Sequence, residues 1–100
     1  MAEQQGSPAV RNRIEINKPR LFKVIFHNDD LTPMDLVVYI LVSIFRKNES
    51  EATSLMLKVH HEGEAVAGVY PLDIAASKTQ RALAMARGEG YPLQITCQPE

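Results

Sequence analysis

The segment HNDDLTPMD, from His27 to Asp35, places an imidazole, an amide and two adjacent carboxylates directly before a nearly unbroken run of apolar residues. Side chains of these types can do three things beside a core. They can shape a turn and complement the positive end of a helix dipole. They can coordinate a metal ion, or they can receive a cationic group as hydrogen-bond acceptors. Which of these applies depends on the other residues that the fold brings to the segment.

A metal ion has the weakest support of the three. A second histidine pair, His60 and His61, could join Asp29 and Asp30 as ligands. The chain, however, has no HExxH motif, no cysteine pair and no EF-hand spacing. We therefore expect neither a bound metal nor another cofactor. A small metal-dependent hydrolase built on these four side chains is kept as an alternative only.

Nucleophilic catalysis is not indicated either. Ser43, Ser54 and Ser77 fall within helical patterns that carry no nucleophile motif, and Cys97 ends an expected strand. Cys97 is also the single cysteine, which excludes an internal disulfide and is typical of a reducing compartment. The residues thus give no indication of a catalytic site.

A second candidate feature is the segment MLKVHHEG, from Met56 to Gly63. Met56 and His60 are four residues apart, so on a helix they share one face, and Val59 adjoins them. If the fold brings this face to the 27–35 segment, the two would form a pocket with a polar rim and an apolar floor. Taken separately, a helix-capping turn and a solvated histidine remain the simpler interpretations.

The first elements that would position these segments are a strand and a helix. Residues 21–26 are apolar and partly β-branched, as expected of a strand. Thr32 is a favoured N-cap, Pro33 suits the first helical position, and Asp35 follows three residues after the cap. The helix that they predict, over 34–45, is apolar on almost every face and should be buried on several sides.

Two more helices and two more strands follow. Asn48 and Glu51 match a capping box, and Gly63 can end that second helix. Its apolar stripe consists of Ala52, Leu55, Met56 and Val59. Residues 65–70 and 93–97 are expected strands, and 72–87 is an alanine-rich helix. The order β-α-α-β-α-β predicts an α+β sandwich of three helices on a small, mainly antiparallel three-stranded sheet.

Length and composition are those of one small globular domain. The chain has 100 residues, of which 45% are hydrophobic and 23% charged, and a net charge of −1. This balance gives no basic footprint for nucleic acid, and no apolar run approaches the length of a membrane span. Residues 1–17 are polar and contain Gly6, Ser7 and Pro8, so we expect a disordered N-terminal extension followed by a core over 18–100.

At this point the two segments support a family resemblance. KPRLFKVIFHNDDLTPMD, together with MLKVHHEGEAVAGVY, resembles the ClpS adaptor family, in which NDDxTPM and MLxVHxxG are a diagnostic pair. The resemblance runs from Lys18 to Gln98 and includes the closing YPL segment. It implies a protein that is not an enzyme but an adaptor, which binds the N-terminal residue of proteins marked for degradation (N-degron proteins). The adaptor hands them to a ClpA- or ClpC-type AAA+ unfoldase of the Clp protease.

The resemblance also implies the site. By motif, Asn28, Asp30 and His60 hold the free α-amino group of the substrate. An adjoining apolar pocket for the first substrate side chain is implied at Phe26, Thr32, Met34, Val37, Met56, Val59 and Leu93. Met34 matches the family's gatekeeper methionine, whose bulk crowds β-branched residues. Phe, Leu, Tyr and Trp are therefore expected as first residues, and Ile and Val are not.

Partner contacts are implied at other positions. Asp73 and Lys78, near the start of the third helix, match residues that help to dock the N-terminal domain of the unfoldase, although an ordinary solvated helix start is the alternative. The N-terminal residues match the family's extension, thought to engage the unfoldase during hand-off. We expect a cytoplasmic monomer that binds neither nucleic acid nor membrane. The family's fold also resembles the C-terminal domain of the bacterial ribosomal stalk protein, an alternative that lacks the motif pair.

Four positions depart from the family pattern. Phe26 and His27 stand where aliphatic residues are frequent, Leu31 replaces a common aromatic residue, and Asp73 is one methylene shorter than the glutamate often found there. These departures leave open how the pocket ranks Phe, Leu, Tyr and Trp. The shorter Asp73 bears on the docking contact, and the resemblance allows an unfoldase of either the ClpA or the ClpC type.

Overall fold

A computed structural model describes residues 19–100 of the chain, so the expected extension over 1–17 lies outside the described residues. The elements are β1 (Leu21–His27), α2 (Met34–Ser43), α3 (Glu49–Glu62), β2 (Glu64–Pro71), α4 (Leu72–Gly88) and β3 (Gln94–Pro99). Their order confirms the β-α-α-β-α-β pattern and the α+β class that the sequence predicts. None of the three helices is both long enough and apolar enough to cross a bilayer.

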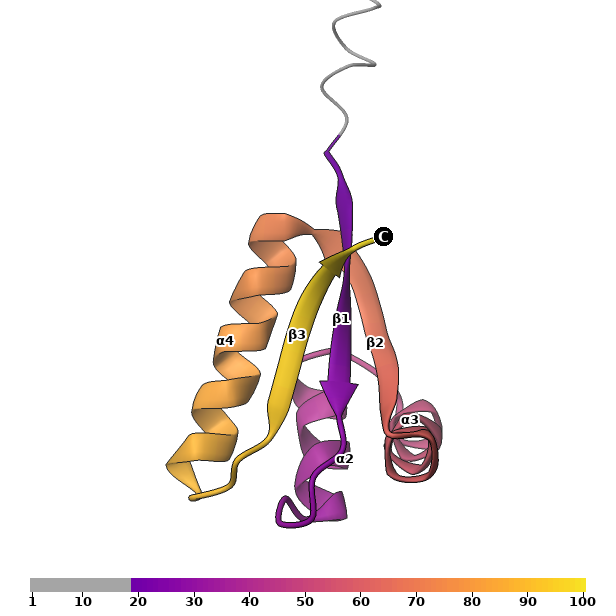
Figure 1. Cartoon of the computed structure of the whole chain (residues 1–100), viewed down its shortest axis with the longest axis vertical. Helices are drawn as coiled ribbons and strands as arrows, with labels where there is room; N and C mark the ends of the chain where they lie inside the picture. The colour runs from indigo at the N-terminus through magenta and orange to yellow at the C-terminus, as the bar shows by residue number, and fades with distance from the viewer. Residues whose placement is uncertain (1–18) are drawn as a thin grey trace, which may run out of the picture.

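The sheet places β1 in the centre. Its strand order is β2-β1-β3, and β1 runs antiparallel to both neighbours (Figure 1). One irregularity interrupts the ladder between β1 and β2, where Val24 pairs with Gly68 but Ile25 pairs with Val66. Beyond this bulge the register continues to the last pair, His27 opposite Glu64. The end of β1 and the beginning of β2 therefore lie side by side.

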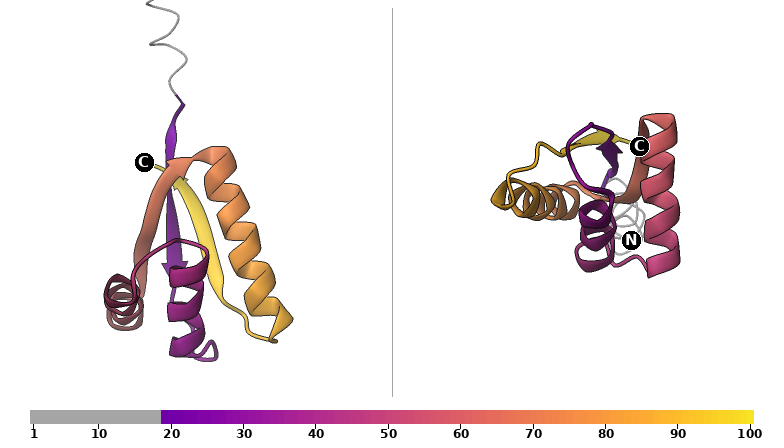
Figure 2. Two further views of the ribbon diagram at one scale, coloured as in Figure 1. Left: turned by 180° about the vertical axis from the view of Figure 1, so that it is seen from behind. Right: turned by 90° about the horizontal axis from the view of Figure 1, so that it is seen from below.

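The helices gather on one side of the sheet. Figure 1 shows α2 behind the central strand, α4 along the side of β3 and α3 beside β2, and the view from behind in Figure 2 accordingly has α2 in front of the sheet. Side chains alternate along a strand, and accordingly Val24 and Phe26 belong to the helix-side core whereas Ile25, although buried, does not. Phe26 meets Phe45 edge to face, with ring centroids 5.3 Å apart. Within the described residues, no helix covers the opposite face of the sheet, which carries the His27 side chain.

The ends of α3 are as the sequence predicts. The Asn48 side chain accepts a hydrogen bond from the Glu51 N–H, and the Glu51 carboxylate accepts one from the Asn48 N–H, which completes the capping box. At the other end Gly63 takes a left-handed conformation with φ of 91°, a region that favours glycine because it has no Cβ. Both ends of the helix that carries His60 are therefore fixed by local sequence.

The start of α2 differs from the expectation. Thr32 is not the N-cap, because that position belongs to Pro33, which has no side chain able to accept a hydrogen bond from the helix. The Thr32 hydroxyl instead donates to an Asp29 carboxylate oxygen at 2.8 Å. The Thr32 N–H also donates to Asp29, at 2.7 Å, so both polar groups of Thr32 belong to the loop that precedes the helix.

The end of α2 also comes earlier than the expected Phe45. The helix ends at Ser43, and Arg46 then takes a left-handed conformation with φ of 60° that reverses the chain. Phe45 turns into the core, where it is only 3% exposed. Packing of this aromatic ring thus outweighs the helical pattern of its neighbours.

Replacement of the Asn48 cap tests the local origin of α3. Asn48→Ala removes the acceptor for the Glu51 N–H and should lower the free energy of unfolding by about 1 kcal/mol, measured by urea denaturation. Ser50→Ala is the matched control, because Ser50 is exposed in the same helical turn and its replacement should change stability by less than about 0.5 kcal/mol. Equal effects of the two substitutions would contradict the capping argument.

Candidate functional site

The two segments singled out in the sequence line one cavity. It has a volume of about 330 Å³ and lies among the loop after β1, the first turns of α2 and the last turns of α3. The lining residues are Asn28, Asp29, Asp30, Leu31, Thr32, Pro33, Met34, Val37, Met56, Val59 and His60. Residues from two distant parts of the chain therefore share a single concave surface.

Most of the predicted site residues are brought together here. The three predicted amine acceptors, Asn28, Asp30 and His60, all line the cavity. Five of the predicted pocket residues join them, namely Thr32, Met34, Val37, Met56 and Val59. Their co-location is a structural result, while their contacts with a ligand stay a prediction.

Phe26 and Leu93 are placed differently. Their exposed fractions are 1% and 2%, and both belong to the hydrophobic core rather than to the cavity wall. Because other core side chains surround them, they present almost no surface to the cavity. The expectation that they line the pocket is therefore not met in this structure.

The loop that forms the polar rim is held by Asp29. One carboxylate oxygen of Asp29 accepts hydrogen bonds from the Leu31 N–H at 2.8 Å and the Thr32 N–H at 2.7 Å. The other oxygen accepts the Thr32 hydroxyl at 2.8 Å. Three donors on one side chain give the loop a defined shape, in the manner of an Asx turn.

The same contacts set the acidity of Asp29. Burial by itself raises the pKa of this carboxyl, but the N–H groups of Thr32 and Leu31, the Thr32 hydroxyl and the Arg87 cation together hold the pKa below its ordinary value of 3.8. The Asp29 carboxylate is therefore an anion whose hydrogen bonds are made within its own loop.

Asp30 has the opposite environment from its neighbour. It is exposed, and among the described residues it accepts no hydrogen bond that would occupy its carboxylate. No side chain or N–H group of residues 19–100 therefore occupies the acceptor oxygens that Asp30 presents at the rim. The two adjacent acids therefore differ in environment, since Asp29 is hydrogen-bonded within the loop and Asp30 is exposed at the cavity.

His60 completes the rim from the last turn of α3. Its side chain is exposed and packs edge to face against His61, with ring centroids 5.2 Å apart. A direct backbone bond joins this end of α3 to the loop, because the Asn28 N–H donates to the Gly63 carbonyl at 2.9 Å. The rim thus has two sides, the Asn28–Asp30 loop and His60, and this main-chain hydrogen bond helps to set the distance between them.

The floor of the cavity is apolar. Val37 and Val59 are buried, with exposed fractions of 7% and 5%, and Met56 is half-buried against the core. Met34 stands at the entrance and is 44% exposed. The cavity thus combines a buried floor with one large, exposed apolar side chain.

The geometry of the cavity does not support the alternative of a metal-dependent hydrolase. Within residues 19–100, His, Cys, Asp and Glu side chains form no group of three or more with a metal-binding arrangement. Asp29, one of the four ligands considered for such a site, is engaged by three donors in its own loop.

Asp73 and Lys78 lie apart from the cavity on α4. Asp73 is exposed in the first turn, between Leu72 and Ile74, which are 53% and 43% exposed. Lys78 is partly engaged, because its ammonium donates to the Ile44 carbonyl at 2.9 Å and lies 5.4 Å from the centre of the Tyr70 ring. Burial, assisted by the cations of Arg81 and Arg46, lowers the pKa of Lys78.

The sequence interpretation missed several lining residues. Leu31 and Pro33 also line the cavity, and Leu31 is 70% exposed. A second depression of about 480 Å³ shares Pro33 and is lined further by Asp35, Leu36, Tyr39, Glu89 and Tyr91. No local sequence motif predicts this depression, since its residues come from the start of α2 and from the connection between α4 and β3.

The fold and the cavity together define a small α+β binding domain. Comparison with protein families then gives its identity. The family described as "ATP-dependent Clp protease adaptor protein ClpS" matches residues 17–96. The chain belongs to this family, as its two motifs predict, and by the family description it is an adaptor of the Clp protease rather than a catalytic subunit.

Comparison with individual proteins gives the same family. The chain is 48% identical to the ClpS adapter protein of Deinococcus radiodurans, over 96% of this chain and 85% of that protein. It is 45% identical to the ClpS adapter protein of Lawsonia intracellularis, over 96% and 88% of the two chains. The solved structure of Agrobacterium tumefaciens ClpS2 bound to L-phenylalaninamide is similar, with a TM-score of 0.80 and 37% identity over 83% of this chain and 100% of that one. The expected family and fold are thereby confirmed.

Substitution of the two adjacent acids separates their roles. Asp29→Ala deletes the acceptor of three hydrogen bonds and should lower the free energy of unfolding by about 1–3 kcal/mol. Asp30→Ala is the matched control at the neighbouring exposed position and should change it by less than about 0.5 kcal/mol. Urea denaturation at neutral pH measures both values.

The stability difference between the wild-type protein and Asp29→Ala should depend on pH in a defined direction. Because the folded-state pKa of Asp29 is lowered, its contribution to stability is present above its ordinary value of 3.8 and is lost as the pH falls through the lower folded value. The difference in free energy of unfolding between the wild-type protein and Asp29→Ala should therefore become smaller in strong acid. A gap that widens on acidification would contradict the assignment.

Proposed function

We propose that the cavity binds the free α-amino group and the large hydrophobic first side chain of N-degron proteins, and that the chain delivers these proteins to a ClpA- or ClpC-type AAA+ unfoldase. The observation that carries the proposal is the pairing of three acceptor side chains, Asn28, Asp30 and His60, with an apolar floor in one small cavity. L-phenylalaninamide, bound by the similar ClpS2 protein, has the same two features, a free amine and a hydrophobic side chain.

The rim suits an ammonium group. An ammonium presents three donors and one positive charge. Asn28 offers an amide oxygen, Asp30 a carboxylate, and the neutral imidazole of His60 an unprotonated nitrogen. Hydrogen bonds to a charged group contribute about 1.5–3 kcal/mol each, so these contacts can distinguish a chain start from an internal peptide bond.

The floor suits one apolar side chain. A volume of about 330 Å³ is at the lower end of small-ligand pockets, which fits a single residue rather than a peptide segment. Burial of a Phe or Leu side chain on Val37, Met56 and Val59 contributes about 1.5–3 kcal/mol. Met34, exposed at the entrance, narrows the cavity near the Cβ of the incoming residue and so disfavours Ile and Val.

Delivery uses a different surface. Asp73 is exposed at the first turn of α4 with apolar neighbours Leu72 and Ile74, and this arrangement of one charge among apolar side chains suits a protein contact. Lys78 contributes from the next turns of the same helix. We propose that this surface docks the N-terminal domain of the unfoldase, and that the adaptor acts in the cytoplasm as a monomer without a cofactor.

Blocking the substrate amine is the central test. Acetylation removes the charge and most of the donors, so an acetylated peptide beginning with Phe should bind about 2–5 kcal/mol more weakly than the free peptide. Fluorescence anisotropy with paired labelled peptides measures the difference. His60→Ala and Asp30→Ala should each reduce it, and equal affinity of wild-type protein for the two peptides would refute the proposal.

Shortening the entrance methionine tests the gate. Met34→Ala removes the side chain that crowds a branched Cβ, so peptides beginning with Ile or Val should gain about tenfold in affinity, a value within the range for one or two methylenes in an apolar pocket. Val42→Ala is the control, because Val42 lies on the same helix at a position outside the cavity. Unchanged selectivity of Met34→Ala would rule out gating.

A further inference from the structure

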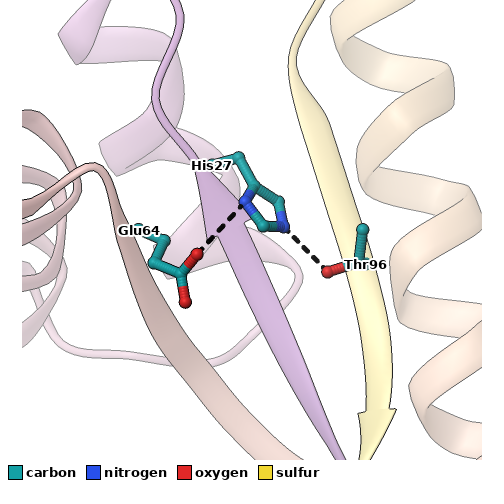
Figure 3. Close-up of polar contacts among 3 residues, drawn as sticks. All are labelled: His27, Glu64 and Thr96. Carbon is teal, nitrogen blue, oxygen red and sulfur yellow. Dashed lines mark hydrogen bonds and ion pairs between the residues drawn. The ribbon is translucent and has the colours of Figure 1, made fainter.

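A side chain on the helix-free face of the sheet links all three strands at the end that carries the cavity loop. His27, the last residue of β1, places its Nε2 atom 2.8 Å from the Thr96 hydroxyl of β3. Its Nδ1 atom lies 3.7 Å from a Glu64 carboxylate oxygen of β2. Figure 3 shows the imidazole lying across the central strand between these two partners. We name these three residues the cross-strand clamp.

The clamp sits where the two halves of the site meet. Asn28 directly follows His27, and Glu64 directly follows Gly63, the residue that ends the helix carrying His60. His27 and Glu64 are partners in the β1–β2 register. Any slip or opening of this last pair would therefore move the Asn28–Asp30 rim relative to the His60 rim.

At this end of the sheet the β1–β3 ladder also reaches its last pair, His27 opposite Gln94. Past the His27–Glu64 pair, the backbone bond from the Asn28 N–H to the Gly63 carbonyl is the next connection between the two rims. Strand ends open more readily than strand centres. A side chain that ties β1 to both neighbours at this position therefore limits opening at the place where the geometry of the acceptors is decided.

We propose that His27 is a positioning residue for the ammonium site, and that it acts through Thr96 and Glu64 to hold Asn28 and Asp30 opposite His60. The inference rests on the proposed function, since it concerns the same amine site. His27 itself does not line the cavity, so it reaches a bound amine only through the backbone that it fixes.

The two contacts of His27 are unequal. The Thr96 contact is short and requires no charge, because either atom can donate according to the imidazole tautomer. The Glu64 contact is longer than a hydrogen bond, and the Glu64 side chain is 61% exposed, so solvent screens it strongly. Most of the clamp's effect should accordingly come from Thr96.

The experiment measures the ratio of affinities for a free peptide beginning with Phe and its acetylated counterpart, in the full-length protein. His27→Leu removes both polar contacts while retaining bulk, and it should lower the affinity for the free peptide by about three- to tenfold, the range expected for one lost hydrogen bond. Its affinity for the acetylated peptide should not change. Thr96→Val should reproduce most of this loss, and Glu64→Gln should have the smaller effect.

A double substitution tests whether the residues act as one unit. His27→Leu combined with Thr96→Val should lose no more affinity than His27→Leu alone, because coupled residues are not additive. His27→Gln, whose amide can still bond to Thr96, should restore most of the loss. Lys23→Met is the matched control, since Lys23 precedes His27 on the same face of β1 and is paired with Val69 and Gln98 away from the loop. It should leave the affinity ratio unchanged.

The outcomes are distinct. If His27→Leu lowers both affinities equally, or lowers neither, the positioning role is overturned while the proposed function stands, provided that wild-type protein still prefers the free amine. If wild-type protein shows no such preference, the proposed function fails and the inference fails with it. Thermal unfolding of each variant, followed by circular dichroism, checks that the comparison is made on folded protein.

Discussion

The antiparallel pairing of β1 with β2 is the constraint on which the rest of the site depends. One half of the cavity follows β1 and the other half precedes β2, so the two halves meet only because the end of one strand lies beside the start of the other. The Asn28 N–H to Gly63 carbonyl bond extends that pairing past the sheet into the cavity wall. Non-local strand pairing thus produces the binding surface, and neither segment could form a pocket alone.

The adjacent acids show how a short polar segment can serve fold and function together. Asp29 turns toward its own loop and accepts three hydrogen bonds, while Asp30 remains exposed at the rim. Successive side chains in a tight loop point in different directions, so neighbouring identical residues acquire different tasks. The anion that fixes the loop also adds negative potential near the rim, which favours a cationic ligand.

Local patterns predicted most of the fold because their causes are local. The Asn48 capping box, Gly63 and the period of the apolar stripe on α3 depend on residues within one helix, and each was read correctly from the sequence. The prediction of Thr32 as a cap was wrong because the helix begins one residue later, with Pro33 at the N-cap, while the Thr32 hydroxyl donates to Asp29 in the preceding loop. Phe26 and Leu93 were assigned to the pocket by motif, but whether an apolar side chain faces a cavity or the core is decided by tertiary packing, which no single segment records.

The arrangement of the sheet separates the two proposed activities. The loop after β1 lies at one end of the strands, and α4 begins at the other end (Figure 1). A substrate held at the loop therefore leaves the first turn of α4 free for a second protein, so an adaptor of this shape can hold both partners at once without overlap. The register also pairs Leu21 with Pro71, immediately before α4. β1 thus begins beside the proposed docking surface, on the side where an unfoldase would be bound.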